Sequence, residues 1–204
     1  MVAARRHEEK GQREDPDAAL MLRAQRGDRQ AFEELFRRHA SAMVRFAARY
    51  VGDEARAEEL AQEIFLRLHR SLPRYAPTAR FKTFLYRIAA NHCLNELRRP
   101  ESRRGAFEPL PAEGPEREGM QPTRPDEMLE GKELEAAVNR ALGCLPERER
   151  MALVLCRFQG LSYREIAAVL EASEAAIKSL VHRATVALSR GLGELSAVAP
   201  EDDA

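Results

Sequence analysis

The chain has 204 residues, of which 44% are hydrophobic, 32% are charged and only 6% are aromatic, and its formal net charge is zero. Rich charge with few aromatic residues is typical of a helical protein with small cores. A neutral chain has no overall field that attracts nucleic acid or an anionic membrane, so binding of either kind must come from local patches.

The three cysteines, Cys93, Cys144 and Cys156, form no CxxC pair and no zinc spacing with histidine. This favours small buried thiols in a reducing cytosol over a metal or disulfide site. No run approaches the ~18 apolar residues that a membrane span requires. Arg5 and Arg6 are not followed by the apolar stretch of a signal peptide. We therefore expect a cytoplasmic protein without membrane insertion, cofactor or metal.

Residues 1–16 are polar and charged, which predicts a disordered tail. Helical periodicity continues over residues 17–99, without strand alternation. Asp28 is expected to cap a helix over 31–51, and Asp53 a helix over 54–72 that stops at Pro73. A loop over 74–79 then leads to a helix over 80–99. The first helix carries a stripe formed by Phe32, Leu35, Phe36, His39 and Met43.

The helix over 54–72 has two contrasting sides. Its core stripe consists of Ala57, Leu60, Ala61, Ile64 and Leu68. The opposite side, which we call the docking face, consists of Glu59, Gln62, Glu63, Leu66 and Arg70. An apolar centre with a charged rim is typical of a protein-binding surface, although a simply solvated face is the alternative.

The helix over 80–99 carries five basic residues and one acid, an excess that suits phosphates. Its polar strip consists of Thr83, Phe84, Arg87, Asn91, Asn95 and Arg98, with Arg80 and Lys82 at the N-terminal end. Amides can read exposed base edges, and an aromatic ring can stack on an unpaired base. The loop before the helix could accept an extruded base. The alternative is a packed helix with a basic end.

The composition changes over residues 100–131, where six prolines interrupt regular structure and eight acids accompany four bases. This predicts a semi-extended linker, because compact domains rarely contain a structureless loop of that length. We therefore expect an all-α fold with two small helical domains, over residues 17–99 and 132–195, and a loose acidic tail over 196–204.

The second domain ends in a predicted helix-turn-helix. Ser162 and Glu165 form a capping box for a helix over 161–170, and Ser173 caps a helix over 174–192. The buried stripe of this last helix consists of Ile177, Leu180, Val181, Ala184 and Leu188. Its recognition face consists of Ser173, Glu174, Lys178, Ser179, His182 and Arg183. Such side chains contact base edges and phosphates, but an ordinary helical hairpin fits the pattern equally well.

Together these segments resemble a bacterial sigma factor of the extracytoplasmic-function (ECF) type. GDRQAFEELFRRH, DEARAEELAQEIFLRLHRSLPRY and FKTFLYRIAANHCLNELRR resemble sigma region two. LPERERMALVLCRFQGLSYREIAAVLEASEAAIKSLVHRATVAL resembles region four. The resemblance implies a non-enzymatic subunit, without a small-molecule substrate, that directs promoter-specific initiation by RNA polymerase.

The resemblance implies one role for each surface. The docking face would bind the clamp of the largest polymerase subunit, and the flap region would be a further polymerase contact. The polar strip, with Arg80 and Lys82, would read and help melt the minus-ten element as single-stranded DNA. The recognition face would read the minus-thirty-five element. The linker would thread toward the RNA exit path, and an anti-sigma factor could cover both domains.

Four residues depart from the family pattern. Phe84 stands where tryptophan is usual, Leu180 where arginine is frequent, and His69 where an aromatic is common. Glu171 occupies the position of a turn glycine, so the turn must either avoid a left-handed backbone or accept strain.

Two other classes of protein remain as alternatives. A conventional helix-turn-helix regulator would bind duplex DNA by itself, often as a dimer. An all-helical enzyme is disfavoured, because the sequence has no Ser/His/Asp order, no metal spacing and no phosphate loop.

Overall fold

The structure, a computed structural model, describes residues 15–97 and 136–198. The helices are α2 (Pro16–Gln25), α3 (Arg29–Val51), α4 (Glu54–Ser71), the 3-10 helix η1 (Leu72–Arg74), α5 (Phe81–Leu97), α7 (Glu147–Arg157), α8 (Tyr163–Leu170) and α9 (Glu174–Val198). Residues 136–143 form another helical stretch. Within the described ranges every regular element is helical, which confirms the predicted all-α class.

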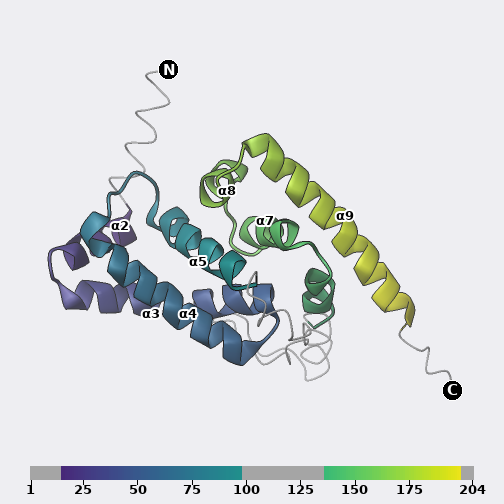
Figure 1. The fold of residues 1–204 in the computed structure, drawn as a ribbon, viewed down its shortest axis with the longest axis horizontal. Helices are drawn as coiled ribbons and strands as arrows, with labels where there is room; N and C mark the ends of the chain where they lie inside the picture. Colours follow the sequence, from purple (N-terminus) through teal and green to yellow (C-terminus); the bar gives the residue numbers. More distant parts are fainter. Residues whose placement is uncertain (1–14, 98–135, 199–204) are drawn as a thin grey trace, which may run out of the picture.

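Helices α2 to α5 form the first half of the molecule (Figure 1). Side-chain oxygens of Asp28 and Asp53 accept hydrogen bonds from the backbone N–H groups of Ala31 and Arg56, so both predicted N-caps are confirmed. Pro73 does not follow the end of α4 directly, because it lies inside η1. The fully buried side chains include Met21, Leu35, Met43, Phe46, Tyr50, Leu60, Ile64, Leu68, Phe81 and Leu85.

Asp15 joins the start of α2 to the start of α5. One carboxylate oxygen accepts from Asp17 N and Ala18 N and so caps α2, while the other accepts from Phe81 N at 2.8 Å. Asp15 and Pro16 are therefore part of the folded bundle, and the expected tail over 1–16 extends two residues too far. Residues 1–14 lie outside the described part.

Helices α7, α8 and α9 form the second half, with α9 along its outside (Figure 1). The capping box of Ser162 and Glu165 is confirmed, and Ser173 Oγ accepts from Ala176 N at 3.2 Å. Helix α9 continues to Val198, three residues beyond the predicted boundary at 195.

In the turn between α8 and α9, Glu171 stands where a glycine is usual and adopts a strained left-handed backbone. Glu171 has φ 50° and ψ 53°, which is the left-handed region. Its N–H donates to Ala167 O and closes the C-terminus of α8. A residue with a Cβ pays roughly 1–2 kcal/mol for this conformation, so the short turn is retained against a local cost.

The two halves pack against each other, with α5 between α4 and α8 (Figure 1). Their buried apolar side chains form one continuous cluster. The buried Arg150 on α7 donates to Tyr50 O at the end of α3, at 2.6 Å, and to Gly143 O at 2.7 Å. Because the last carbonyls of a helix lack intrahelical partners, Arg150 caps α3 from the other half of the molecule.

Burial differs from expectation at a few positions. Phe36, predicted within the apolar stripe of its helix, is 46% exposed, and its ring packs edge-on against Phe65 at 4.7 Å between centroids. Only Cys93 is a buried thiol, and burial raises its pKa to about 12. Cys144 is exposed and Cys156 is half-buried, so the expectation of three buried cysteines is wrong.

Some predictions lie outside the described residues. These are Arg98 of the polar strip, the linker over 100–131 and the end of the acidic tail. Among the residues that are described, no helix is both long enough and apolar enough to cross a membrane.

Replacing Glu171 with glycine should raise the free energy of unfolding by about 1 kcal/mol, because glycine adopts a left-handed backbone without a Cβ penalty. Urea denaturation of the full chain measures the change. The matched control is Glu171→Ala, which removes the carboxylate but keeps the Cβ and should bring no such gain. An equal gain in both variants would assign the cost to the carboxylate instead of the backbone.

Candidate functional site

The docking face stands on a confirmed core stripe. Ala57, Leu60, Ala61, Ile64 and Leu68 are all buried on the inner side of α4. On the outer side Glu59, Gln62 and Arg70 are exposed, and Leu66 is 56% exposed at their centre. An exposed leucine amid charged and amide groups is the composition expected at the centre and rim of a protein interface.

One acid of the docking face contacts α5 directly, and a second is linked to α5 through Arg56. Glu63 Oε2 lies 2.6 Å from Nε2 of the buried His92. Arg56 contacts Glu59 Oε2 at 2.5 Å and forms an ion pair with the buried Glu96 through its other amino group. The sequence did not indicate these contacts, because His92 lies 29 residues after Glu63 and Glu96 lies 40 residues after Arg56 along the chain.

The polar strip on α5 is only partly accessible. Arg87, Asn91 and Asn95 are exposed, as are Arg80 and Lys82 before them. Phe84 is half-buried: its ring packs edge-on against Tyr75 at 5.0 Å, and the Arg87 guanidinium lies 5.4 Å from its centroid. Thr83, expected on the open strip, is only 5% exposed because α8 covers it.

The loop before α5 borders a recess that is too small for a base. It is lined by Ala76, Thr78, Ala79, Thr83, Phe84 and Arg87, and by Ala168 of α8. Its volume of about 30 Å³ holds roughly one water molecule. Since α8 supplies one wall, a base could enter only if the second half of the molecule moved away.

The turn between α7 and α8 binds the start of α5. Lys82 Nζ donates to Gln159 O at 2.6 Å, and Tyr86 OH donates to Gln159 Oε1 at 2.5 Å. Burial raises the pKa of the Tyr86 hydroxyl, which keeps it protonated as a donor. Next to this turn, the Arg49 guanidinium lies 4.6 Å from the centroid of the Phe158 ring. We call this set of contacts the interdomain clasp.

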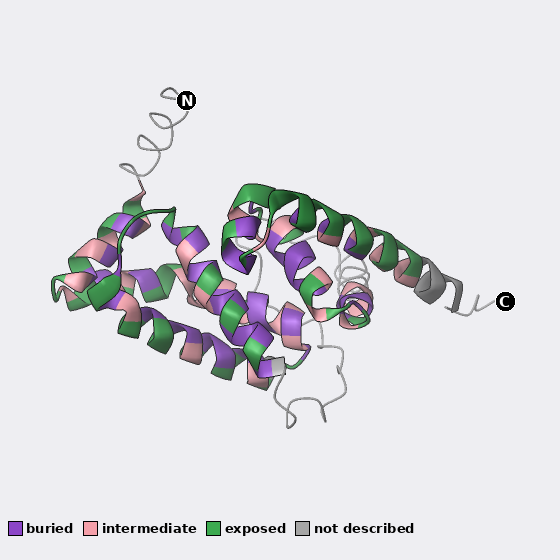
Figure 2. Cartoon of the chain, turned by 45° about the horizontal axis from the view of Figure 1, so that its top comes forward, coloured by how far each residue is buried: buried purple, intermediate pink, exposed green. Residues whose placement is uncertain are grey.

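The recognition face lies on the outer side of α9, which is exposed over residues 174–190 (Figure 2). Ser173, Glu174, Lys178, Ser179, His182 and Arg183 are all exposed. Of the predicted buried stripe, Ile177, Val181 and Ala184 are buried, whereas Leu180 and Leu188 are half-buried. The Arg183 side chain is held in place, since its Nε donates to Glu149 Oε1 at 2.7 Å and its Nη1 to Ser179 Oγ at 3.1 Å.

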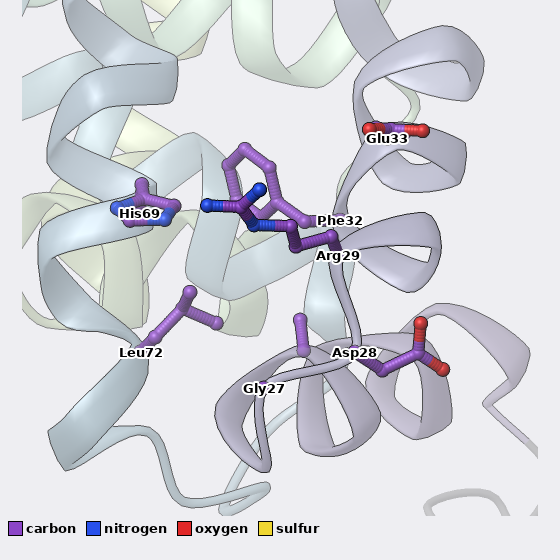
Figure 3. A pocket seen from close by; sticks show the side chains of 8 residues that line it. Gly27, Asp28, Arg29, Phe32, Glu33, His69 and Leu72 are labelled. Carbon is purple, nitrogen blue, oxygen red and sulfur yellow. The ribbon is translucent and has the colours of Figure 1, made fainter.

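A hollow of about 410 Å³ lies away from the polar strip and the recognition face, between the α2–α3 turn and the end of α4 (Figure 3). The Arg29 side chain extends toward His69, whereas the Asp28 carboxylate points away from it. Phe32 packs edge-on against His69 at 5.1 Å. Among the described residues no group of three His, Cys, Asp or Glu side chains could hold a metal ion.

Comparison with known proteins identifies both halves. The family model for sigma-70 region 2 matches residues 35–104, and that for sigma-70 region 4 matches residues 135–188. RNA polymerase sigma-H factor of Pseudomonas aeruginosa is 34% identical over 187 residues, covering 89% of this chain and 96% of that protein. ECF RNA polymerase sigma-E factor of Escherichia coli K12 is 34% identical over 180 residues, covering 84% and 92%.

Solved structures show the same fold. The chain aligns with CnrH, solved in complex with the cytosolic domain of CnrY, at a TM-score of 0.64 and 28% identity, over 90% of this chain and 99% of that one. It aligns with the sigma factor RpoE of Bartonella quintana, solved with the anti-sigma factor NepR, at a TM-score of 0.62 and 23% identity, over 79% and 96%.

The chain therefore belongs to the sigma-70 family of transcription initiation factors, which are not enzymes and which bind core RNA polymerase and promoter DNA. Within that family it is an ECF-type sigma factor, similar to the sigma-E and sigma-H factors, and its function is promoter recognition for RNA polymerase.

Changing both Phe158 and Gln159 to alanine should loosen the interdomain clasp. The change removes a cation–π contact and a hydrogen bond, each contributing about 1 kcal/mol, so the open form should gain about tenfold or more in relative population. Small-angle X-ray scattering of the full chain should show a larger radius of gyration. Cys144→Ser, an exposed change outside the clasp, should leave it unaltered; an unchanged radius in the double variant would show that the clasp does not hold the halves together.

Proposed function

We propose that this sigma factor divides promoter recognition among three surfaces. The docking face (Glu59, Gln62, Glu63, Leu66 and Arg70) binds the clamp of the largest polymerase subunit. The polar strip, with Arg80 and Lys82, reads and helps melt the minus-ten element. The recognition face (Ser173, Glu174, Lys178, Ser179, His182 and Arg183) reads the minus-thirty-five element. The observation that carries this division is that each helix has its other side in the core and exposes described members of its set: Leu66 on α4, Arg87 and Asn91 on α5, and Lys178 and His182 on α9.

The division of DNA binding between two surfaces fits the zero net charge of the chain. Neither DNA surface has the extended basic field of a protein that binds DNA tightly alone. Binding of both domains to one polymerase raises the effective concentration of each at the promoter, so two weak modules suffice. We also propose the flap region as the polymerase contact of the second domain, and the cytoplasm as the location of the protein.

The packing of the two halves against each other supports a switch between an inactive, closed form and an active form in which the halves have separated. Thr83 is covered by α8 and the recess beside Phe84 is closed by Ala168, so the strip cannot receive a base in this arrangement. Opening must therefore precede minus-ten recognition. Because the similar structures of CnrH and RpoE are complexes with CnrY and NepR, we propose that an anti-sigma factor binds this chain across both halves.

Run-off transcription from a promoter library tests the proposal. The purified chain is added to core polymerase, and transcripts are compared with those of core alone. Promoter-specific transcripts are the expected result. No initiation at any promoter, together with a footprint of the chain alone on duplex DNA, would instead support a conventional helix-turn-helix regulator.

Leu66→Asp should weaken binding to core polymerase at least tenfold, because it places a charge at the apolar centre of the docking face. Fluorescence anisotropy with labelled sigma factor measures the affinity, and unfolding curves establish that both halves stay folded. The matched control is Glu58→Ala, an exposed change on the same helix outside the docking face. Wild-type affinity of the Leu66 variant would remove this face from the polymerase interface.

Arg87→Ala combined with Asn91→Ala should impair promoter opening more than tenfold while duplex binding of the holoenzyme falls much less. The reason is that phosphate and base contacts of the strip are made to melted DNA. Permanganate reactivity reports opening, and gel shift at low temperature reports duplex binding. Arg74→Ala, an exposed basic change outside the strip, is the control. Equal loss of opening and duplex binding would contradict a specific role in melting.

A further inference from the structure

Helix α5 faces α4 with two buried titratable side chains that the promoter-reading role does not use. His92 and Glu96 are each 4% exposed, while the polar strip occupies another side of the same helix. A buried polar side chain costs free energy unless it has a partner. The partner of His92 is Glu63 of the docking face, and the partner of Glu96 is Arg56, which in turn contacts Glu59 of that face, so both residues have a role beyond filling the core.

His92 contacts a docking acid directly. Its Nε2 lies 2.6 Å from Glu63 Oε2, a close approach although the ring N–H is not aligned for an ideal hydrogen bond. Burial lowers the pKa of His92, with Arg67 adding to the shift and Glu63 and Glu96 opposing it. The lowered pKa favours the neutral ring. The His92 ring contacts only one oxygen of the Glu63 carboxylate, and the Glu63 side chain is still 44% exposed. Glu63 can therefore accept a hydrogen bond from an outside partner at the same time.

A second docking acid is held through one intermediate. Glu96 forms an ion pair with Arg56, and Arg56 in turn contacts Glu59 Oε2 at 2.5 Å. The Arg56 side chain is one-third exposed, whereas that of Glu96 is buried. Arg56 thus connects a buried anchor on α5 with an exposed acid on α4.

We propose that His92, and Arg56 held by Glu96, are positioning residues of the docking face, which fix Glu63 and Glu59 in the conformation that polymerase binds. The proposal rests on the docking role assigned to that face above. Exposed glutamates sample many rotamers, and ordering each one on association costs about 0.5–1.5 kcal/mol. Fixing them beforehand from α5 removes that cost from the binding step. The clamp of the polymerase would then meet preformed acceptors, although neither His92 nor Glu96 touches it.

A double-mutant cycle on the full chain tests the proposal. The affinity for core polymerase is measured for His92→Leu, for His92→Gln, for Glu63→Ala and for His92→Leu combined with Glu63→Ala. We expect His92→Leu to weaken binding about three- to tenfold, the factor that corresponds to ordering one side chain. His92→Gln, which keeps a neutral N–H donor, should stay within about twofold of wild type. In the Glu63→Ala background, His92→Leu should add no further loss.

Each other outcome has a definite meaning. An equal loss from His92→Leu with and without Glu63, or a glutamine variant as weak as leucine, would show that His92 acts only through packing and would overturn the proposal. If Glu63→Ala binds core like wild type, Glu63 has no docking role and nothing remains for His92 to position. If Glu63→Ala is weak but His92→Leu is not, the docking role stands and only this inference fails. Far-UV circular dichroism monitors folding, and His92→Asn, too short to reach Glu63, replaces the leucine variant if that one does not fold.

Discussion

The packing of α5 against the helices around it is the constraint on which the other features depend. Leu85, Ala89 and Cys93 are fully buried, and the helix contacts α3, α4 and α8. Burial over most of its circumference fixes the rotation of α5 about its axis. That rotation determines which side chains remain on the polar strip, which approach the docking acids and which meet the second half of the molecule.

When the two halves are packed together, hydrogen-bond donors of the polar strip and its N-terminal end are paired with acceptors of the second half. In the clasp, Lys82 donates to the carbonyl oxygen of Gln159, and beside the clasp the Thr83 hydroxyl lies 3.4 Å from a carboxylate oxygen of Glu165 on α8. If the strip engages DNA as proposed, phosphate or base oxygens would compete with these acceptors for the same donors. In a protein of zero net charge, local donors can be paired with acceptors of the same chain. Promoter DNA would then have to displace the Gln159 carbonyl and the Glu165 carboxylate from the strip.

Sequence periodicity predicts the fold better than it predicts accessibility. Helix α4 packs on one side only, so its 3.6-residue pattern separates the core stripe from the docking face correctly, down to the exposed Leu66. The N-caps at Asp28 and Asp53 and the capping box at Ser162 are likewise local signals, and all three are present in the structure. The presence of glutamate at a turn position anticipates the strain at Glu171.

The contacts that sequence alone did not reveal join segments distant along the chain. Thr83 is covered by a helix about 80 residues later, and Asp15 caps a helix 66 residues away. His92 and Glu96 could not be connected with Glu63 and Arg56 without the three-dimensional packing of α4 on α5. Helical periodicity indicates which side of a helix is buried. It does not indicate which segment covers that side or which polar side chain of that segment forms a contact with it.

The sharing of α5 among three surfaces has a consequence for genetics. On the proposed division of roles, the same helix supports polymerase docking, base reading and the clasp, so a loss-of-function substitution on it cannot be attributed to one defect from its phenotype. The location of second-site suppressors separates the cases. Suppressors on α4 would indicate a docking defect, those in the turn before α8 an altered clasp, and those in the promoter a defect of the strip. For ECF sigma factors built in this way, suppressor maps are more informative than single-substitution scans of the helix itself.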